Sequence, residues 1–278
     1  MYLRRKVDGF LAEWKENPKH KSLVIHGARD IGKRESIRHF AEGRYRHIVE
    51  INLAKEEKYH TIINDGYAAE AIIKHITLLD PAKQLSEGET LIFFDELQAF
   101  PPIATALKAF DIDGRFDVIC SGALTRYDAI KIESISVGYK SDYTMHSLDF
   151  EEFLWAKGYD ESVVDELLIH MQELKPLSSV QMDIFESLFF EYVLLGGMPE
   201  VITQYLVSNT FTGSVKLQRR LLSTYEGDIR TYAQGVDRKR TLKVFNAIAA
   251  QLAEKNKKFT LSRLEHGARF KDYRDSIE

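Results

Sequence analysis

The residues best suited to carry out chemistry lie in a glycine-rich stretch near the start of the chain. The sequence there reads Gly27-Ala28-Arg29-Asp30-Ile31-Gly32-Lys33, a G-x-x-x-x-G-K pattern, and continues with Arg34 and Glu35. Glycines let backbone N–H groups close around a di- or triphosphate, and the lysine reaches the terminal phosphates. A helix beginning after such a loop points its positive end at the same anion. The spacing therefore predicts that residues 27–35 bind the phosphates of a nucleotide.

The residue after Lys33 departs from this pattern. A serine or threonine normally follows the lysine, and its hydroxyl binds Mg²⁺, but this chain has Arg34. Ser36 does not replace that hydroxyl, because two positions further along a helix it points to another side. A guanidinium adds positive charge near the metal position and can pair with phosphate directly, excluding the metal. We therefore expect ATP or ADP to bind, Mg²⁺ to bind poorly, and hydrolysis to be weak or absent.

Further along the chain, two apolar runs end in polar side chains. Residues 90–94 lead into Asp95 and Glu96, and residues 118–120 lead into Ser121. Asp95 is placed to hold Mg²⁺ or its water shell, and Glu96 to polarise an attacking water. Ser121 has the position from which a polar residue senses a γ-phosphate. Two carboxylates alone would indicate a solvated strand end, but together with the glycine-rich loop they predict a nucleotide site.

Other charged residues have weaker claims to a role. Arg29 contacts phosphate or a neighbouring subunit, or it pairs with an acidic neighbour. Arg126, Arg230 and Arg240 are candidates for an arginine finger that acts on another subunit's nucleotide. We interpret the acidic cluster at 149–152 as a helix N-terminal cap rather than an acid–base group. The nine histidines lack the spacing of a zinc site.

The composition is that of a globular chain without a membrane or secretion signal. The 278 residues are 44% hydrophobic and 29% charged, which is enough for one large or two modest domains. We expect neither a membrane span nor secretion, since no run of eighteen apolar residues occurs and the start lacks an apolar signal segment. The single cysteine, Cys120, excludes an intramolecular disulfide and a cysteine-based zinc site. These features favour the cytoplasm.

The charge is unevenly distributed along the chain. The net charge is −4, yet residues 238–278 contain eleven Lys and Arg against five Asp and Glu. A basic segment at one end predicts contact with DNA. The alternatives are a solvated helical face, or a surface that docks on a domain outside this chain.

Strand and helix patterns alternate through the first part of the chain. We expect strands at 22–27, 47–53, 90–95, 116–121 and 143–149, and helices at 10–16, 33–42, 67–79 and 103–110. This alternation favours a parallel sheet that is covered by helices on both faces, with right-handed crossovers.

After residue 150 the pattern becomes helical. Helices are expected at 151–157, 161–174, 180–195, 199–207, 214–232 and 240–254, with a tight turn at 196–199. A short helix at 261–266 and a basic helix at 268–277 complete a helix-turn-helix pattern. We therefore predict three domains: a nucleotide-binding domain at 1–158, a helical lid at 159–237 and a basic segment at 238–278.

Five motifs resemble, in order, those of the prokaryotic AAA-type P-loop ATPases, the additional-strand class with a catalytic glutamate. Residues 26–33 resemble the family's G-x-R-Q-x-G-K-T loop, 93–98 its D-E-x-Q strand end, 120–123 its T-G-S sensor strand, 147–154 its L-x-F-x-E-F-L segment and 196–200 its G-G-x-P-E lid motif. The resemblance covers essentially the whole chain.

This resemblance implies a five-stranded P-loop NTPase sheet of order 5-1-4-3-2, in which the loop and Asp95-Glu96 flank the fourth strand and Ser121 lies between them. It also implies a lid whose Pro199 turn approaches the nucleotide, and a partial winged-helix segment at 238–278. The family's last, nuclease-like domain is expected to be missing from this chain. A homo-oligomer stays open.

Three functions remain open on this basis. The first is a switch in which the nucleotide state moves the helical lid against the sheet. The second is a scaffold that keeps ATP or ADP as a structural ligand without hydrolysing it. The third is a DNA-binding module that uses residues 238–278, whose binding would weaken steeply with salt.

Overall fold

The computed structural model describes residues 1–123, 138–232 and 235–277. The chain forms two compact units, Met1–Asn209 and Thr210–Glu278. This division concerns compactness alone, so the domain limits predicted at 158 and 237 stay predictions.

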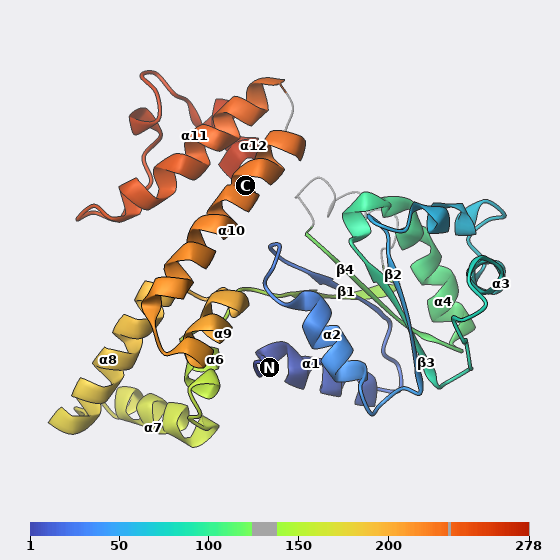
Figure 1. Ribbon diagram of the computed structural model, residues 1–278, viewed down its shortest axis with the longest axis horizontal. Helices are drawn as coiled ribbons and strands as arrows, with labels where there is room; N and C mark the ends of the chain where they lie inside the picture. Colours follow the sequence, from blue (N-terminus) through green and yellow to red (C-terminus); the bar gives the residue numbers. More distant parts are fainter. Residues whose placement is uncertain (124–137, 233–234, 278) are drawn as a thin grey trace. The chain divides into compact units, whose positions relative to one another are not determined.

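A five-stranded parallel sheet forms the centre of the first unit (Figure 1). The strands lie in the order β2-β3-β4-β1-β5, which confirms the predicted order. Their bounds are β1 Ser22–His26, β2 His47–Asn52, β3 Thr90–Asp95, β4 Asp117–Gly122 and β5 Lys140–Thr144. Because every pairing is parallel, all carboxyl ends meet at one edge, where ligands of such sheets bind. The ends of β1 and β3 therefore flank the end of β4.

The fifth strand lies earlier in the chain than predicted. It pairs residues 140–144 with β1, whereas the sequence pattern placed it at 143–149. Met145 still donates its N–H to the His26 carbonyl at 2.8 Å, and the chain then leaves the sheet. Met145 and Leu148 are buried all the same. Their apolar character reflects packing against the β1–α2 loop and the following helices, rather than a place in the strand.

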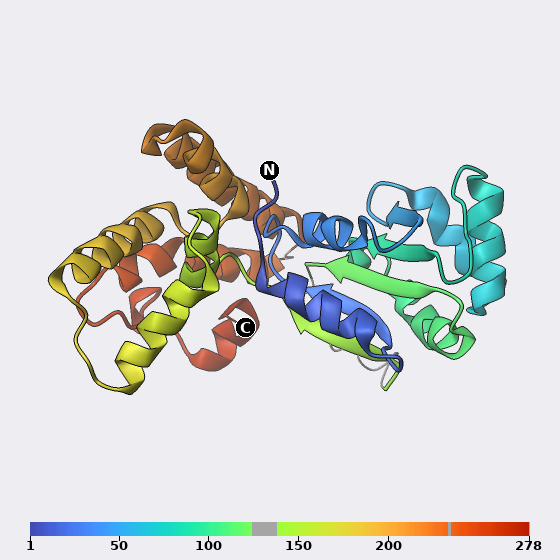
Figure 2. The same ribbon diagram turned by 90° about the horizontal axis from the view of Figure 1, so that it is seen from below.

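Helices cover both faces of the sheet, as the alternation predicted (Figure 2). Alternate side chains along each strand face opposite sides. Leu91 and Phe93 pack with α1 (Lys6–Glu16) and α2 (Lys33–Ala41). Ile92 and Phe94 pack on the other face, against the elements that follow β2 and β3. These are η1 (Glu57–Ile63), α3 (Ala69–Leu79), η2 (Leu97–Ala99), η3 (Pro101–Ala106) and α4 (Leu107–Asp113).

Four helices follow β5 in the described part of the first unit: α6 (Phe150–Ala156), α7 (Glu161–Gln172), α8 (Ser179–Leu195) and α9 (Pro199–Ser208). Asp149 is the N-cap of α6 and forms a capping box with Glu152. This confirms the interpretation of the acidic cluster as a helix cap. None of the helices in the described part of the chain is long and apolar enough to cross a membrane.

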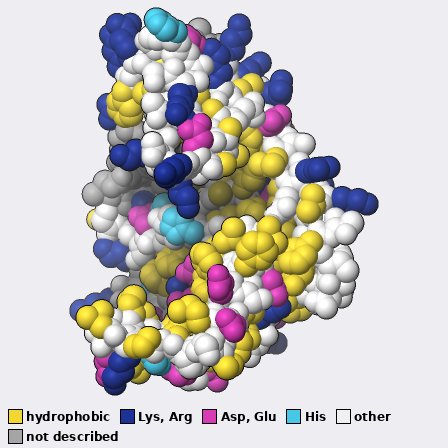
Figure 3. All heavy atoms as spheres, turned by 90° about the vertical axis from the view of Figure 1, so that its left-hand side faces the viewer, with side chains coloured by type: hydrophobic (Ala, Val, Ile, Leu, Met, Phe, Trp, Pro, Cys, Tyr) yellow, Lys and Arg dark blue, Asp and Glu magenta, His cyan; other side chains and the backbone are white. Residues whose placement is uncertain are grey.

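Helices α7 and α8 bury few of their apolar side chains. In α8 only Leu188 and Leu195 are buried, and α7 has no buried residue within the part of the chain described. Hydrophobic side chains accordingly gather at the lower part of the surface in Figure 3. The exposed ones include Leu168, Ile169, Met171, Val180, Met182, Ile184, Phe189, Phe190 and Val193. Few buried contacts are typical of elements that move easily.

The regular elements described in the second unit are all helices. It consists of α10 (Phe211–Tyr232), α11 (Gly235–Leu252), η4 (Leu261–Arg263) and α12 (Phe270–Ile277). Part of its basic charge is neutralised locally, by the ion pairs Lys243–Glu265, Arg263–Glu254 and Arg269–Asp272. The winged-helix assignment and the contact with DNA stay predictions.

Candidate functional site

The loop between β1 and α2 has a backbone that only glycine fits at its first position. A Cβ added to Gly27 would lie 2.1 Å from the Met145 carbonyl oxygen. Ile31 is buried in the core beneath the loop, while Gly32 adopts a left-handed conformation (φ 94°) at the N-cap of α2. Asp30 also has a positive φ of 61°. The G-x-x-x-x-G pattern thus follows from a sharp turn that packs closely on the end of β5.

The loop presents a group of free N–H donors. The first hydrogen bond of α2 runs from Ser36 N–H to the Gly32 carbonyl at 3.0 Å. Among the residues that the structure describes, the backbone N–H groups of residues 30–35 have no acceptor. These donors coincide with the positive end of the α2 dipole. Such an arrangement binds anions.

Lys33 projects into the same loop. Its ammonium donates to the carbonyl oxygens of Gly27 at 3.0 Å and Ala28 at 2.6 Å. Burial lowers the pKa of Lys33, while the charges of Glu96 and Asp95 act in the opposite direction. The lysine therefore brings a positive charge into the loop, within the electrostatic reach of both carboxylates.

Strand periodicity places four polar side chains on the α2 face of the sheet. Asp95 follows Leu91 and Phe93 at two-residue spacing, and Ser121 follows Ile119, so both share that face. Glu50 and Asn52 in β2 alternate with residues of the opposite core. The periodicity was readable in the sequence, but Glu50 and Asn52 were not among the predicted site residues.

Asp95 is the centre of a buried hydrogen-bond network. One carboxylate oxygen accepts the Ser121 hydroxyl at 2.5 Å, and the other accepts the Asn52 amide at 2.9 Å. The residue is only 6% exposed. Ser121 is therefore bonded to the acidic residue of the neighbouring strand, and its role as a γ-phosphate sensor stays a prediction.

Arg34 lies beside this network. Its Nη2 forms an ion pair with Glu50, and its Nε lies 4.0 Å from Asp95 Oδ2. Nε is buried and has no hydrogen-bond partner in the described part of the chain. Arg38, one turn further along α2, donates to the second oxygen of Glu50 at 2.7 Å. The Glu50 carboxylate thus lies between two guanidinium groups, and it holds one of them next to Asp95.

The residues present do not fit the Mg²⁺ ion that this kind of loop implies. Position 34 supplies a cation instead of a hydroxyl, and both oxygens of Asp95 already accept hydrogen bonds. Within the described ranges, no three His, Cys, Asp or Glu side chains converge as a metal site would require. Mg²⁺ prefers an octahedral shell of oxygen ligands. The guanidinium stands where one of those oxygens belongs.

Glu96 has an unusual backbone at the end of β3. Its φ of 60° and ψ of 49° are left-handed, a conformation that non-glycine residues rarely adopt and that tends to occur at functional sites. Its carboxylate accepts a hydrogen bond from the Gln98 amide. The side-chain carbonyl oxygen of Gln98 in turn accepts a hydrogen bond from the Ala123 N–H at 3.1 Å, so the Gln98 side chain links Glu96 to the end of β4. The predicted activation of water by Glu96 stays a prediction.

The glycine-proline turn before α9 reaches the loop. A Cβ added to Gly32 would lie 3.6 Å from Pro199 Cγ. The turn is itself fixed on the segment after β5, since Leu148 donates its N–H to the Gly197 carbonyl at 2.8 Å. A Cβ on Gly197 would lie 2.2 Å from the Leu148 carbonyl oxygen, which explains the glycine. Pro199 therefore lies against the loop, and its part in nucleotide binding stays a prediction.

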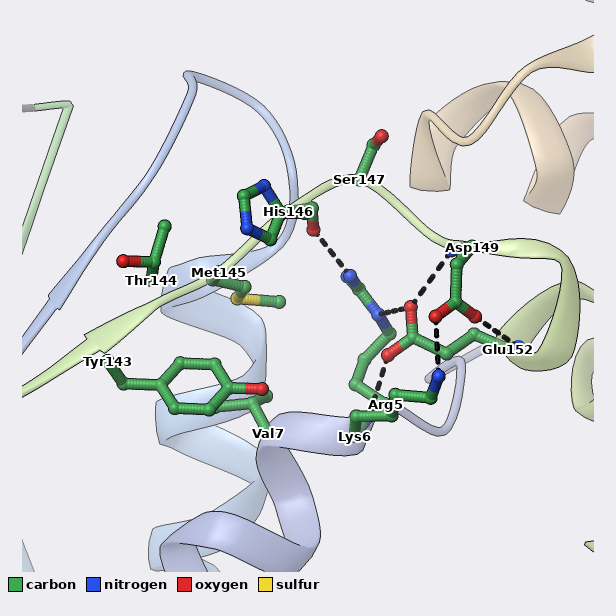
Figure 4. A pocket seen from close by; sticks show the side chains of 10 residues that line it. All are labelled: Arg5, Lys6, Val7, Tyr143, Thr144, Met145, His146, Ser147, Asp149 and Glu152. Carbon is green, nitrogen blue, oxygen red and sulfur yellow. Dashed lines mark hydrogen bonds and ion pairs between the residues drawn. The ribbon is translucent and has the colours of Figure 1, made fainter.

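Arg5 joins the loop to the start of α6, a connection that sequence reasoning missed. Its guanidinium donates to the carbonyl of Ile31 at 2.7 Å. It also donates to the carbonyl of His146 at 2.6 Å, and its Nε lies 3.2 Å from Glu152 (Figure 4). Arg5 is only 4% exposed, whereas the neighbouring Arg4 is 58% exposed. Nothing in the sequence distinguishes the two arginines.

A pocket of about 230 Å³ opens beside Arg5. Figure 4 shows that the charged side chains on its wall pair with one another, Arg5 with Glu152 and Lys6 with Asp149. Lys6 N–H also donates to Glu152 at 2.6 Å. The pocket is lined by Arg5, Lys6, Val7, Tyr143, Thr144, Met145, His146, Ser147, Asp149 and Glu152.

The remaining predicted residues lie at the rim of the loop or outside it. Ala28, Arg29, Asp30 and Glu35 are exposed, and Arg29 Nε lies 3.8 Å from Asp30 Oδ2. Of the three arginine-finger candidates, one lies outside the described residues and two lie in the second unit. Arg126 is the one outside the described residues. In the second unit, Arg230 pairs with Glu226 at 3.8 Å, and Arg240 pairs with Asp237 at 3.9 Å. Their roles stay predictions.

Comparisons with known proteins bear on these observations. Residues 19–154 match the model of a family described as an AAA domain, and residues 186–278 match a family described as a domain of unknown function. No curated protein matches the sequence. A solved structure of PCH-2 from C. elegans is similar with 10% identity and a TM-score of 0.34. The match covers 59% of this chain and 46% of the PCH-2 chain, so this chain spans less than half of that length.

Proposed function

We propose that this chain binds ATP or ADP at residues 27–35 and responds to it as a conformational switch, a proposal supported by the match of residues 19–154 to the model of an AAA domain and by the order of the sheet. One observation carries the proposal: the Lys33 ammonium lies inside a loop whose N–H groups are free to donate. Asp95 and Glu96 lie within its electrostatic reach. Pro199 and Arg5 border the loop on the side of the helical lid.

Phosphate binding follows from exchange of partners. The phosphate oxygens accept the N–H groups of the loop and the Lys33 ammonium, which gives up the carbonyls of Gly27 and Ala28. Each hydrogen bond to a charged group contributes about 1.5–3 kcal/mol. Ala28, Arg29, Asp30 and Glu35 are exposed at the rim of the loop.

The switch is supported by two contacts between the loop and later helices, one to α6 just before the predicted lid and one to α9 within it. Arg5 bonds the Ile31 carbonyl of the loop and pairs with Glu152 in the first turn of α6. Pro199, the first residue of α9, packs against Gly32. A change in the loop backbone on phosphate binding therefore acts on both α6 and α9. The few buried side chains of α7 and α8 favour movement of the lid as a whole.

Hydrolysis is slow in this proposal, because Arg34 replaces a ligand on which the reaction depends. Glu96 would still accept a proton from the attacking water, held by Gln98. Loss of one strongly stabilising group raises the barrier by several kcal/mol, and about 4 kcal/mol corresponds to about a thousandfold in rate.

Calorimetric titration of the full chain with ATP and with ADP tests the binding. We expect saturable binding of one nucleotide per chain, and an affinity at least about a hundredfold lower in the Lys33→Met variant, the equivalent of about 2.7 kcal/mol. Lys19→Met, which changes an exposed lysine, is the matched control and should bind as the native chain does. Absence of saturable binding, or equal binding by the Lys33 variant, would refute the proposed site.

Phosphate release tests the enzymatic part. We expect little turnover from the native chain with ATP and Mg²⁺, and more from Arg34→Thr, which restores a hydroxyl. Robust turnover by the native chain would show that Arg34 does not limit hydrolysis. Proteolysis of the lid with and without nucleotide then separates the switch from a scaffold, because a scaffold leaves the cleavage pattern unchanged.

A further inference from the structure

We infer that Arg34 takes the place of Mg²⁺, so that this site binds a nucleoside di- or triphosphate without a divalent cation. The inference rests on the proposed function, since it concerns how the same loop receives its nucleotide. Three features of the described residues carry it: the place of the guanidinium, the way it is held, and the state of its Nε.

The guanidinium lies where the metal would have to lie. Arg34 directly follows Lys33 in the first turn of α2, and its Nε lies 4.0 Å from Asp95 Oδ2. A metal ion in this kind of site is bounded by the side chain at position 34 and by the first carboxylate after β3. A divalent ion would be repelled by the guanidinium and would compete for an Asp95 carboxylate that Ser121 and Asn52 already occupy.

Glu50 holds the guanidinium in this place. Its carboxylate pairs with Arg34 through one oxygen and with Arg38 through the other. Glu50 lies in β2 on the same face as Asp95, and its side chain is only 16% exposed. Because Arg38 also neutralises Glu50, the charge of Arg34 is only partly cancelled.

The Nε–H group of Arg34 is a hydrogen-bond donor without an acceptor in the described part of the chain. It is buried, makes no hydrogen bond in that part of the chain, and lies 4.0 Å from Asp95 Oδ2. Buried donors without a partner are rare in folded proteins. A guanidinium matches phosphate geometry with its planar set of N–H groups. A phosphate oxygen is the acceptor that this donor lacks, and it also supplies the charge that the group neutralises.

The test compares nucleotide affinity with and without a divalent cation. ADP and ATP are titrated into the full native chain in Mg²⁺ and in EDTA, and the dissociation constants should agree within about threefold, less than 0.7 kcal/mol. For Arg34→Thr we expect the affinity in EDTA to fall by about 10-fold to 100-fold, and Mg²⁺ to restore part of it. Arg34→Lys keeps the positive charge but lacks the planar guanidinium, so its affinity in EDTA should lie between those of the native chain and Arg34→Thr.

The controls distinguish this inference from the proposed function. Arg46→Thr changes an exposed arginine just before β2, at the amino ends of the strands and away from the loop at their carboxyl ends. This variant should bind nucleotide as the native chain does in both buffers. Native binding that weakens tenfold or more in EDTA would overturn the inference while leaving the nucleotide site intact. So would unchanged binding by Arg34→Thr in EDTA. Failure of the native chain to bind in either buffer would instead refute the proposed function.

The comparison of native protein in the two buffers requires no variant, so it decides the matter even if Arg34→Thr fails to fold. Folding of each variant is checked by thermal unfolding. A Glu50→Gln variant adds a measure of positioning, because it leaves Arg34 in the chain but removes the charge that holds it. We expect its affinity in EDTA to fall less than that of Arg34→Thr. If Glu50→Gln instead lost as much affinity as Arg34→Thr, and lost it in Mg²⁺ as well as in EDTA, the loop itself would be damaged. That result would contradict a role of Glu50 specific to metal-free binding.

Discussion

Two arginines flank the phosphate loop, and they differ in what surrounds them. Arg5 is 4% exposed, donates to two backbone carbonyls and lies 3.2 Å from Glu152. Arg34 has a side chain that is 34% exposed, shares Glu50 with another arginine and keeps its Nε 4.0 Å from Asp95 Oδ2. Both guanidinium groups have a buried Nε that makes no hydrogen bond in the described part of the chain, but Arg5 also donates to two backbone carbonyls, whereas Arg34 pairs with carboxylates alone. We infer that Arg5 stabilises the fold around the loop and that Arg34 interacts with the nucleotide that the loop binds.

The largest effect should come from Arg5→Met. The change leaves Glu152 buried without its cation and leaves the carbonyls of Ile31 and His146 without their donor. Removing one partner of a buried pair costs about 3–5 kcal/mol, which denaturant unfolding would measure. Arg4→Met is the matched control, and we expect it to cost less than about 1 kcal/mol because its ion pair with Glu161 is exposed. Equal losses in the two variants would remove the distinction between the buried and the surface arginine.

A second variant examines the Asp95 side of the comparison. Asn52→Ala removes a donor from a carboxylate that is buried and leaves one of its oxygens unbonded. We expect a loss of about 1–3 kcal/mol in the free energy of unfolding. The Ser121→Ala variant should cause a similar loss, since it removes the other donor. If both are neutral, Asp95 is held by its charge partners rather than by these neutral donors.

Arg34→Met should alter stability least of the three sites. Glu50 keeps Arg38, and Asp95 keeps both of its neutral donors. Because the Arg34 side chain is about one third exposed, solvent screens its ion pair, and we expect a loss under about 1 kcal/mol. Denaturant unfolding without ADP measures this loss in the free energy of unfolding, and unfolding with ADP measures how much the ligand stabilises the variant. A loss as large as that of Arg5→Met would assign Arg34 to the fold and not to the ligand.

The smallest effect concerns pH. Burial lowers the pKa of Lys33 in the loop, against the opposing influence of Glu96 and Asp95. As the pH rises through this lowered pKa, Lys33 loses its proton, and the neutral amine no longer attracts phosphate. Nucleotide affinity should therefore fall at an alkaline pH below the range in which an ordinary lysine titrates. Titrations in buffers of different ionisation enthalpy should also show proton uptake in that window. Affinity that stays constant there would show that Lys33 keeps its ordinary pKa.

The sequence predicted the sheet better than the surroundings of the loop. The apolar runs of β1 to β4 are local signals, and the five-strand order was inferred from the resemblance and then observed. The fifth strand was misplaced because Met145 and Leu148 are apolar for packing reasons unrelated to a strand. A hydrophobic pattern records burial, and it does not record which element provides the burial.

The positions of Arg34 and Arg5 show the same limit in the candidate site. A motif position indicated that Arg34 would lie near the metal position, and the structure puts it 4.0 Å from Asp95. That Glu50 holds it followed only from the pairing of β2 with β3 and from the face shared by alternate residues. Arg5 depends on Glu152, which is far away in sequence, so no local pattern identifies the pair.

Glu152 has a consequence for how this protein can be handled. The same carboxylate completes the capping box of α6, receives the backbone N–H of Lys6 and neutralises Arg5. A protease that trims the first five residues would therefore remove Arg5, and would leave Glu152 without its cation and the carbonyls of Ile31 and His146 without their donor. Tags placed ahead of Met1 should be harmless, whereas shortened versions that start at α1 should be prone to aggregation, and a ligand that protects the amino terminus from digestion would report on the state of the loop.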